Sequence, residues 1–414
     1  MRWLRALGMG LWLMAGSAFA AEPVSLSYQF SPLHGPPVYV QGQKLKTGAA
    51  PAETLVKEPK YSSENPLYGI ATLGTGDDTT FTFVLDESEG TGKGYDLLYV
   101  DSNNNEDLTD DPPVRATQRQ GRQVFSPIRL LVPVNGQKTL YQAELVASPH
   151  YESKQRQVTG TDYYLKGLGY FVGSARFGDK TYSVALVDYN ANGLFNDLFT
   201  VFDPEGDKTG DMLLVDLDGD GEFAGKYPTL DETIHCGKRI VVDNQFYDFA
   251  ARPDGVSFSV APSQVNLRPI KSEYSRFSLT LASAEGQWPI EAETGEAKAP
   301  PGTYQVTTWS LDLKDAKRRT WHMAGHTCGG DAPPPQLTVS EPDGGFFKLR
   351  APLLAKVRAE RSPEEGYKFQ FEIRLSAAEH VTDLKVNDAK PPEPLLRILD
   401  EKGRQVEKLK FHYG

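Results

Sequence analysis

The sequence has little cysteine, no long apolar run beyond its amino terminus, and fewer basic than acidic side chains. Only two cysteines occur among 414 residues, so one intrachain disulfide is the most that can form. After the amino-terminal segment, no stretch approaches the ~18 consecutive apolar residues of a membrane-spanning helix, so we expect no membrane span. The 55 Asp and Glu against 44 Lys and Arg argue against nucleic acid as a partner.

The sequence also lacks the short motifs that mark common catalytic sites. It has no Gly-x-Ser-x-Gly, no His-Glu-x-x-His and no P-loop. Paired carboxylates for acid–base chemistry stay open in a chain with 55 acids, but no pair stands out. A sugar-stacking platform is another alternative, although aromatic residues on strands more often belong to the core. Its candidate members are Trp288, Trp309, Trp321, Tyr163 and Tyr164.

The amino terminus has the order of a secretory signal peptide. Arg2 and Arg5 precede an apolar stretch over 7–15, and small residues follow up to Ala20. We therefore expect residues 1–20 to be a signal peptide cleaved after Ala20, and the mature chain to be periplasmic or secreted. Calcium is available at the millimolar level in extracellular surroundings.

Alternation of apolar and polar residues with period two predicts an all-β protein. A β-rich domain is expected over 21–265 and a β-sandwich over 266–414, with one short helix over 51–60. The clearest predicted strands are 80–85, 140–146, 181–187, 238–242, 256–260, 277–281, 304–309, 368–375 and 395–399.

The segment Pro300-Pro-Gly-Thr-Tyr-Gln-Val306 resembles the turn and strand of immunoglobulin-like or transthyretin-like bacterial modules. The segment 399–404 is typical of a hairpin turn. The resemblance implies a β-sandwich for the carboxy-terminal part.

Three loops begin with aspartate, and each follows an apolar run typical of a strand. They are Asp101-Ser-Asn-Asn-Asn105, Asp188-Tyr-Asn-Ala-Asn-Gly193 and Asp216-Leu-Asp-Gly-Asp-Gly221. Oxygen-bearing side chains at positions 1, 3 and 5, with glycine at position 6 for the sharp turn, can gather several ligands around one calcium ion. The run Asp96-Leu-Leu-Tyr-Val-Asp101 recurs as Asp211-Met-Leu-Leu-Val-Asp216, which indicates a repeated strand-and-loop unit.

The three loops resemble EF-hand-like DxDxDG calcium loops of the bacterial secreted type, as in dockerin-type and thrombospondin type 3 modules. They depart from a full EF-hand, because helices do not flank them and position 12 holds Pro112, Phe199 and Tyr227 instead of glutamate. The first loop also has Glu106 at the glycine position. The resemblance covers the loops only, and it implies Ca²⁺ as the cofactor.

Each loop needs a closing ligand from elsewhere. A carboxylate at position 10 is the candidate in the first two loops, whereas Asp231 or Glu232 is the candidate in the third. A backbone carbonyl is expected at position 7. The third loop should bind most tightly, because it has three carboxylates. The predicted ligands are Asp101, Asn103, Asn105, Asp107, Asp110, Asp188, Asn190, Asn192, Leu194, Asp197, Asp216, Asp218, Asp220, Glu222, Asp231 and Glu232.

Histidine and cysteine pairs leave several alternatives open. His322, His326 and Cys328 lie close together along the chain, and His235 precedes Cys236. They could bind zinc or copper if the two segments met. Gly325 instead favours a loop around His326. The two cysteines could form a disulfide, stay as buried thiols or be reactive.

Two functions from different classes are consistent with these features. The first is an exported, non-catalytic calcium-binding β-protein with a structural or surface-interaction role. Its partner would be an unknown protein, or a cell-surface or glycan partner. The alternative is a secreted hydrolase, with glycans as one substrate class, in which the calcium loops are structural.

Overall fold

The computed structural model describes most of the chain, in eleven segments. The described residues are 23–31, 36–51, 55–91, 94–151, 158–199, 210–223, 232–327, 335–349, 354–362, 366–374 and 379–412. They form strands and no helix, which confirms the all-β prediction. In particular, these segments hold no helix that is long and apolar enough to span a membrane.

Some predictions concern, wholly or in part, residues outside these described segments. The predicted signal peptide, Asp231 and Cys328 lie outside the described segments, and so do residues 52–54 of the predicted helix. The prediction of a helix over 51–60 is wrong for the described remainder, where Lys57 forms an isolated β-bridge with Asp107. This pairing between distant residues replaces the local hydrogen bonds of a helix.

Most of the amino-terminal part is a nine-stranded sheet. Its order is β3 (Gln43–Lys44), β11 (Val158–Gly167), β10 (Gln137–Tyr151), β9 (Arg122–Val134), β8 (Val114–Arg119), β7 (Leu97–Val100), β6 (Thr80–Asp86), β5 (Leu67–Thr72) and β4 (Lys46–Gly48). Neighbouring strands are antiparallel, and most follow one another along the chain. Except for the pair β3–β11, the sheet can therefore be built from consecutive antiparallel strands.

Two smaller sheets complete this part of the molecule. The five-stranded sheet has the order β15 (Thr233–His235), β14 (Met212–Val215), β13 (Lys180–Val187), β12 (Gly169–Phe177) and β2 (Ser27–Phe30). The four-stranded sheet has the order β1 (Pro23–Ser25), β18 (Ser257–Pro262), β17 (Gln245–Ala251) and β16 (Arg239–Val242). All three sheets contribute buried apolar side chains to one core, which includes Phe125, Leu186 and Phe258.

The hairpins β6–β7 and β13–β14 are built alike. The residue after β7, Asp101, donates its backbone N–H to the carbonyl of Thr82 in β6 at 3.1 Å. The residue after β14, Asp216, donates in the same way to Ser183 in β13 at 3.0 Å. The repeated unit expected from the sequence is therefore a repeated hairpin.

A second core lies in the carboxy-terminal part, between two further sheets. The three-stranded sheet has the order β22 (Glu296–Ala299), β19 (Arg268–Ser272) and β26 (Gly345–Phe347). The larger sheet has the order β21 (Gly286–Ala292), β20 (Arg276–Ser283), β23 (Gly302–Lys314), β24 (Thr320–Thr327), β29 (Glu379–Val386), β28 (Gly366–Arg374) and β27 (Leu354–Ser362), and β25 (Gln336–Val339) also pairs with β23. Ile270 and Phe347 of the smaller sheet pack with Leu279 and Trp309 of the larger one. This is a β-sandwich arrangement.

Tyr304 links the predicted turn to its strand. Its hydroxyl donates a hydrogen bond to the carbonyl of Pro300 at 2.7 Å, and the ring packs against Trp288. A tyrosine bonded to the backbone a few residues upstream occurs in immunoglobulin-like sandwiches.

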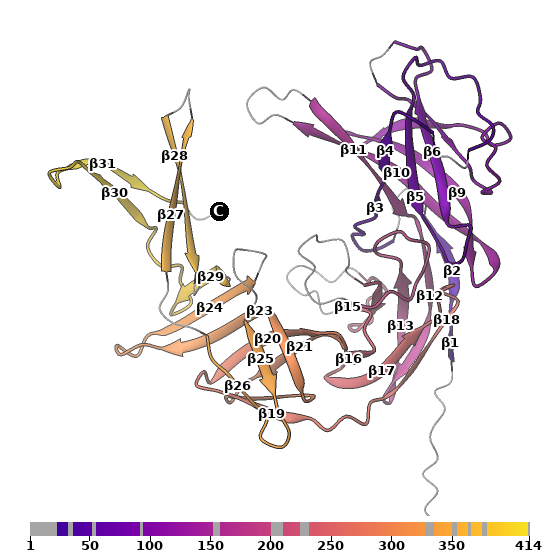
Figure 1. The fold of residues 1–414 in the computed structure, drawn as a ribbon. Coiled ribbons are helices and arrows are strands. Elements are labelled where there is room, and N and C mark those ends of the chain that lie inside the picture. Colours follow the sequence, from indigo (N-terminus) through magenta and orange to yellow (C-terminus); the bar gives the residue numbers. More distant parts are fainter. Residues whose placement is uncertain are drawn as a thin grey trace, which may run out of the picture.

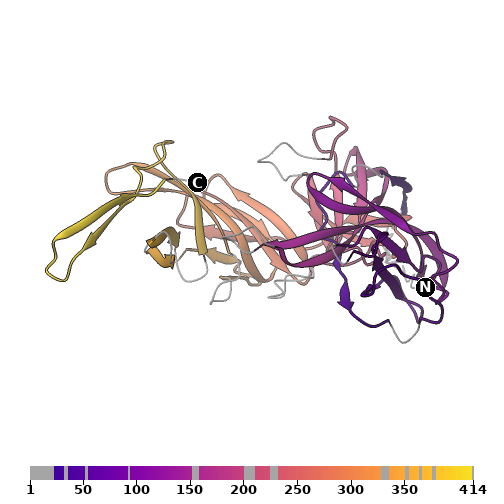
Figure 2. The same ribbon diagram turned by 90° about the horizontal axis from the view of Figure 1, so that it is seen from above.

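The last strands project from the sandwich. The hairpin β27–β28 joins the sheet through the pair Arg374 and His380. Among the described strands, β30 (Leu395–Leu399) pairs only with β31 (Gln405–Lys410). The strands follow an arc from the amino-terminal sheets on the right of the view to these hairpins on the left (Figure 1). Seen from above, the molecule is elongated, and the hairpins lie at the end away from the amino-terminal sheets (Figure 2).

All nine of the clearest predicted strands are confirmed, with ends that differ by a few residues. They correspond to β6, β10, β13, β16, β18, β20, β23, β28 and β30. The expected loop around His326 is wrong, because residues 320–327 form β24 between β23 and β29. Only glycine fits at position 325 of this strand, because a side chain would collide with the carbonyl of His380 and the ring of Trp309.

Candidate metal-binding loops

Asp216, Asp218 and Asp220 come together at the end of β14. Each offers a carboxylate oxygen within 4.8 Å of the others, so the three residues could hold a metal ion. Asp216 shapes the loop by accepting hydrogen bonds from the backbone N–H groups of Gly219 at 2.8 Å and Gly221 at 3.2 Å. Both glycines have positive φ, 75° and 80°, which residues with a side chain rarely adopt.

Glu232 reaches this loop from the start of the next strand. Its Oε1 accepts hydrogen bonds from the N–H groups of Leu217 at 3.0 Å and Asp218 at 3.4 Å. Burial raises the pKa of Glu232, and the nearby carboxylates of Asp218 and Asp216 raise it further. Of the two residues considered for closing this loop, Glu232 therefore lies at the loop, whereas Asp231 lies outside the described segments.

The loop that follows β13 is organised around a buried aspartate. Asp188 accepts hydrogen bonds from the N–H groups of Ala191 at 2.7 Å and Gly193 at 2.8 Å, and from the hydroxyl of Tyr141 at 2.9 Å. Burial raises the pKa of Asp188 to about 7. The charge of Asp197 acts in the same direction.

Asp197 occupies the place that the sequence predicted for a closing ligand. Its Oδ2 accepts hydrogen bonds from the side-chain amides of Asn190 at 2.9 Å and Asn192 at 2.6 Å. The predicted ligands at positions 3, 5 and 10 of this loop are therefore together. In this arrangement the side-chain amides of Asn190 and Asn192 turn their N–H groups toward the carboxylate of Asp197. To bind a cation, the two amides would turn their oxygens toward it.

The first loop keeps the same design without a glycine at position 6. Asp101 accepts hydrogen bonds from the N–H groups of Asn105 at 3.0 Å and Glu106 at 2.8 Å, and Glu106 itself has a φ of 67°. The side-chain amide of Asn105 donates to Asp110 at 2.9 Å. The predicted position 10 again lies beside position 5.

Two lysines bring positive charge to the first loop. Lys57 Nζ lies 2.6 Å from the carboxylate of Asp107, and this contact lowers the pKa of Asp107 to about 2. Lys138 Nζ donates to the backbone carbonyl of Asn103 at 2.6 Å. The Oδ1 atom of Asn103 is buried and has no hydrogen-bond partner among the described residues. In the third loop, by contrast, no lysine or arginine of the described segments forms an ion pair with the three aspartates.

All three loops share the turn at positions 5 and 7. The side-chain oxygen of position 5 accepts the backbone N–H of position 7. The pairs are Asn105 with Asp107 at 3.0 Å, Asn192 with Leu194 at 2.8 Å, and Asp220 with Glu222 at 2.8 Å.

A further carboxylate recurs beside each loop and accepts the backbone N–H of position 2, which directly follows the leading aspartate. Sequence reasoning named Glu232 at the third loop and missed Asp111 and Asp211 in this role. The pairs are Ser102 with Asp111 at 2.9 Å, Tyr189 with Asp211 at 3.1 Å, and Leu217 with Glu232 at 3.0 Å. Burial raises the pKa of all three acids. Asp96 and Asp211 recur at the head of the repeated run, and this recurrence was a sequence signal that an acid there accepts a backbone N–H. Asp96 accepts the N–H of Ser88 at 2.6 Å.

The histidines are not gathered into one site. His322 Nδ1 lies 2.8 Å from Asp312, whereas the ring of His326 stacks on His380. Four residues of a strand span about 13 Å, so His322 and His326 are too far apart along β24 to share an ion. His235 packs against aromatic rings of the amino-terminal part, including Tyr189.

Cys236 is buried, and its sulfur forms no disulfide with any residue that the structure describes. Burial raises the pKa of this thiol well above its ordinary value, which disfavours the reactive thiolate. Because Cys328 lies outside the described segments, the disulfide alternative stays a prediction.

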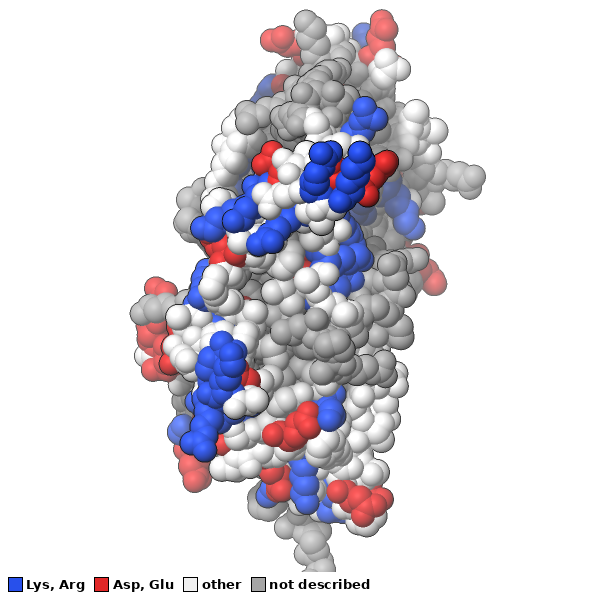
Figure 3. All heavy atoms as spheres, turned by 90° about the vertical axis from the view of Figure 1, so that its left-hand side faces the viewer, with Lys and Arg blue, Asp and Glu red and all other residues white. Residues whose placement is uncertain are grey.

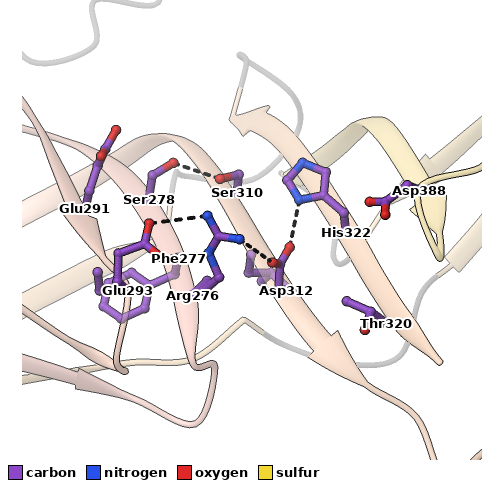
Figure 4. Close-up of a pocket in the computed structure, with 12 residues that line it drawn as sticks. Arg276, Phe277, Ser278, Glu291, Glu293, Ser310, Asp312, Thr320, His322 and Asp388 are labelled. Atoms are coloured by element: carbon purple, nitrogen blue, oxygen red, sulfur yellow. Dashed lines mark hydrogen bonds and ion pairs between the residues drawn. The ribbon is translucent and has the colours of Figure 1, made fainter. Parts of the chain in front are cut away.

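A polar groove of about 330 Å³ lies on the exposed face of the larger carboxy-terminal sheet (Figure 4). It contains the His322–Asp312 pair, and Arg276 lies 3.8 Å from the same aspartate. The hydroxyls of Ser278 and Ser310 face each other at 2.8 Å. Because one carboxylate orients the imidazole, His322 could take up or release a proton toward the groove.

No protein-family model, curated protein or solved structure matches this chain.

Proposed function

We propose that the chain is an exported, non-catalytic calcium-binding β-protein, in which Ca²⁺ fixes the loops at strand ends. The observation that carries this proposal is the meeting of Asp216, Asp218 and Asp220 within 4.8 Å at the end of β14. Two oxygens on opposite sides of a calcium ion are about 4.8 Å apart, because each Ca–O distance is about 2.4 Å. Oxygen-only ligands favour a hard cation such as Ca²⁺ over zinc or copper.

Charge supports an ion at the third loop more strongly than at the first. Three carboxylates that converge with no lysine or arginine of the described segments paired to them repel one another, and a divalent cation would remove that repulsion. In the first loop, the ammonium group of Lys57 already offsets the charge of Asp107. We therefore expect the third loop to bind most tightly and the first to bind most weakly.

Metal content and calorimetry test this proposal. The purified mature protein, equilibrated with Ca²⁺ and freed of excess, should retain calcium, and the double variant Asp218→Asn/Asp220→Asn should retain one equivalent less. Asp179→Asn is the matched control, because Asp179 is an exposed acid of the β12–β13 turn that lies outside every loop. A protein that retains no calcium, or a double variant that retains as much as the control, would overturn the proposal.

We assign the surface-interaction role to the projecting carboxy-terminal hairpins. An isolated two-stranded hairpin is marginally stable in water, so a partner would stabilise β30–β31. Lysine and arginine side chains gather on this side of the molecule (Figure 3). The exposed basic residues of the hairpins that form no ion pair among the described residues are Arg361, Lys368, Arg397, Lys402 and Lys408. A partner with an acidic surface, either a protein or a cell-surface glycan, would complement them.

The groove around His322 favours a second candidate function, the secreted hydrolase. A histidine oriented by Asp312 beside two hydroxyl groups offers a general base. A screen of the purified protein against polysaccharides and peptides tests it, with His322→Ala as the variant. Turnover that disappears in this variant and persists in Asp218→Asn/Asp220→Asn would replace the non-catalytic proposal by the hydrolase.

A further inference from the structure

A second groove, in the amino-terminal part, has a different chemistry from the calcium loops. It has a volume of about 450 Å³, and its lining includes Tyr39, Tyr164, Tyr189, Arg122 and Lys166. The groove lies over the strands β10 and β11, and Tyr164 and Lys166 of β11 are two residues apart on one face. None of these residues is a predicted calcium ligand.

The groove is lined by positively charged side chains, although the surrounding domain is acidic. Residues 21–265 have 20 Lys and Arg against 34 Asp and Glu, whereas residues 266–414 have 22 against 21. Burial lowers the pKa of Lys166, and the nearby Arg122 and Arg119 lower it further, although Glu144 acts in the opposite direction. Arg122 and Lys166 line the same groove of a domain that is acidic as a whole, and an anion bound between them would relieve their repulsion.

Arg122 is the cation best placed to meet such an anion. It is exposed, and no carboxylate of the described segments forms an ion pair with it. Arg119 instead pairs with Glu144. A guanidinium group can bind a carboxylate or sulfate through two parallel hydrogen bonds.

Tyr39 is held in place while its ring remains accessible. Tyr39 is 69% exposed, and Lys166 Nζ lies 4.7 Å from the centre of its ring. The segment that carries Tyr39 is fastened at two points, since Lys166 Nζ donates to the carbonyl of Val40 at 3.2 Å and the N–H of Gly42 donates to the carbonyl of Tyr189 at 3.0 Å. An exposed ring on a fixed segment offers an apolar face to a ligand at little cost in conformational entropy.

We propose that this groove binds an acidic saccharide, with its carboxylate or sulfate on Arg122 and Lys166 and a sugar ring on Tyr39. Sugars present both an apolar ring face and hydroxyl groups, and Ser148 and Gln41 line the same groove as hydrogen-bonding partners. A long polyanion such as nucleic acid would meet the acidic surface around the groove, which disfavours it. The inference goes beyond the calcium proposal, because it needs no ion in any loop.

Calorimetric titration of the full mature protein tests this inference, with two matched probes. A short oligogalacturonate carries the carboxylates, and its fully methyl-esterified form has the same rings without charge. We expect the acidic form to bind at least tenfold more tightly than the ester. The titrations are run in EDTA, so that failure of the calcium proposal leaves this result unchanged.

Variants locate the binding. Arg122→Gln and Arg122→Gln/Lys166→Gln should weaken the acidic probe at least tenfold, and Tyr39→Ala should weaken it several-fold. Arg129→Gln is the matched control, because Arg129 is an exposed arginine of the same strand, β9, outside the groove. Arg122 and Tyr39 are both exposed, so the test does not depend on the half-buried Lys166. Three results would each overturn the inference. The first is equal binding of the acid and the ester, and the second is an equal loss of affinity in Arg129→Gln and Arg122→Gln. The third is that neither oligogalacturonate nor chondroitin sulfate binds at millimolar concentration. Sulfate or an oligonucleotide that binds as tightly as the saccharide would overturn its saccharide part.

Discussion

The carboxylate of Asp211 accepts a hydrogen bond from the backbone N–H of Tyr189 at 3.1 Å, and this bond joins the end of β13 to the beginning of β14. The other oxygen of Asp211 accepts the N–H of Asp197 at 2.8 Å. One buried side chain therefore holds both ends of the second loop in place.

We expect Asp211→Ala to lower the free energy of unfolding by about 3 kcal/mol, because two backbone N–H groups would lose their partner in a buried place. Asp211→Asn keeps one acceptor oxygen and should lose less. Urea denaturation in EDTA measures both variants without a contribution from calcium. If the alanine variant were no less stable than the asparagine variant, Asp211 would not be holding the loop.

Charge counting ranks the calcium ligands. Asp216→Ala, Asp218→Ala and Asp220→Ala should each weaken calcium binding about tenfold more than Asn103→Ala or Asn190→Ala, because a lost carboxylate removes a charge and a lost amide removes only a dipole. Isothermal titration of the five variants measures the difference. Equal losses throughout would show that carboxylates do not set the affinity.

The lysine beside the first loop should reduce its affinity for calcium. In Lys57→Gln the carboxylate of Asp107 loses its partner at 2.6 Å, so the weakest class of calcium sites should tighten several-fold. Lys46→Gln is the control, since Lys46 lies on β4 and forms no ion pair among the described residues. Equilibrium dialysis at millimolar calcium measures the change. An unchanged or weaker site would mean that the first loop does not bind calcium.

His235 predicts a dependence of stability on pH. Burial lowers its pKa below the ordinary value of 6.5, so the folded chain favours the neutral imidazole. The unfolded chain then binds more protons as the pH falls below about 6.5, and stability is lost in that range with a slope of at most about 1.4 kcal/mol per pH unit. Urea denaturation in EDTA at pH 7.5 and 5.5 should show a smaller difference for His235→Phe than for the natural chain. An identical difference in both would assign the effect to other groups.

The positions of strands and loops could be predicted because they depend on neighbouring residues. Apolar alternation located β6 and β13, and each Asp-led loop follows a strand as expected. The pattern of positions 1, 3 and 5 also identified Asp216, Asp218 and Asp220, which the structure brings together.

What the sequence did not predict depends on contacts between distant residues. Lys57 meets Asp107 through a bridge between segments, and no local pattern marks that pair. Asp211 was noticed as part of a repeat, but its role follows from the register in which Val187 faces Met212. Gly325 favoured a loop by composition, whereas pairing with strands on both sides makes it part of β24.

The pairing of β1 with β18 constrains the order in which the amino-terminal part can fold. Pro23 lies opposite Ser259, so the first strand of this part has no neighbour in its sheet until almost all of the part has been synthesised. Pairing of residues so far apart along the chain raises the contact order and slows folding. We therefore expect the first strand to be among the last to dock, and a nascent chain that stops before β18 to expose Val24 to chaperones or to proteases.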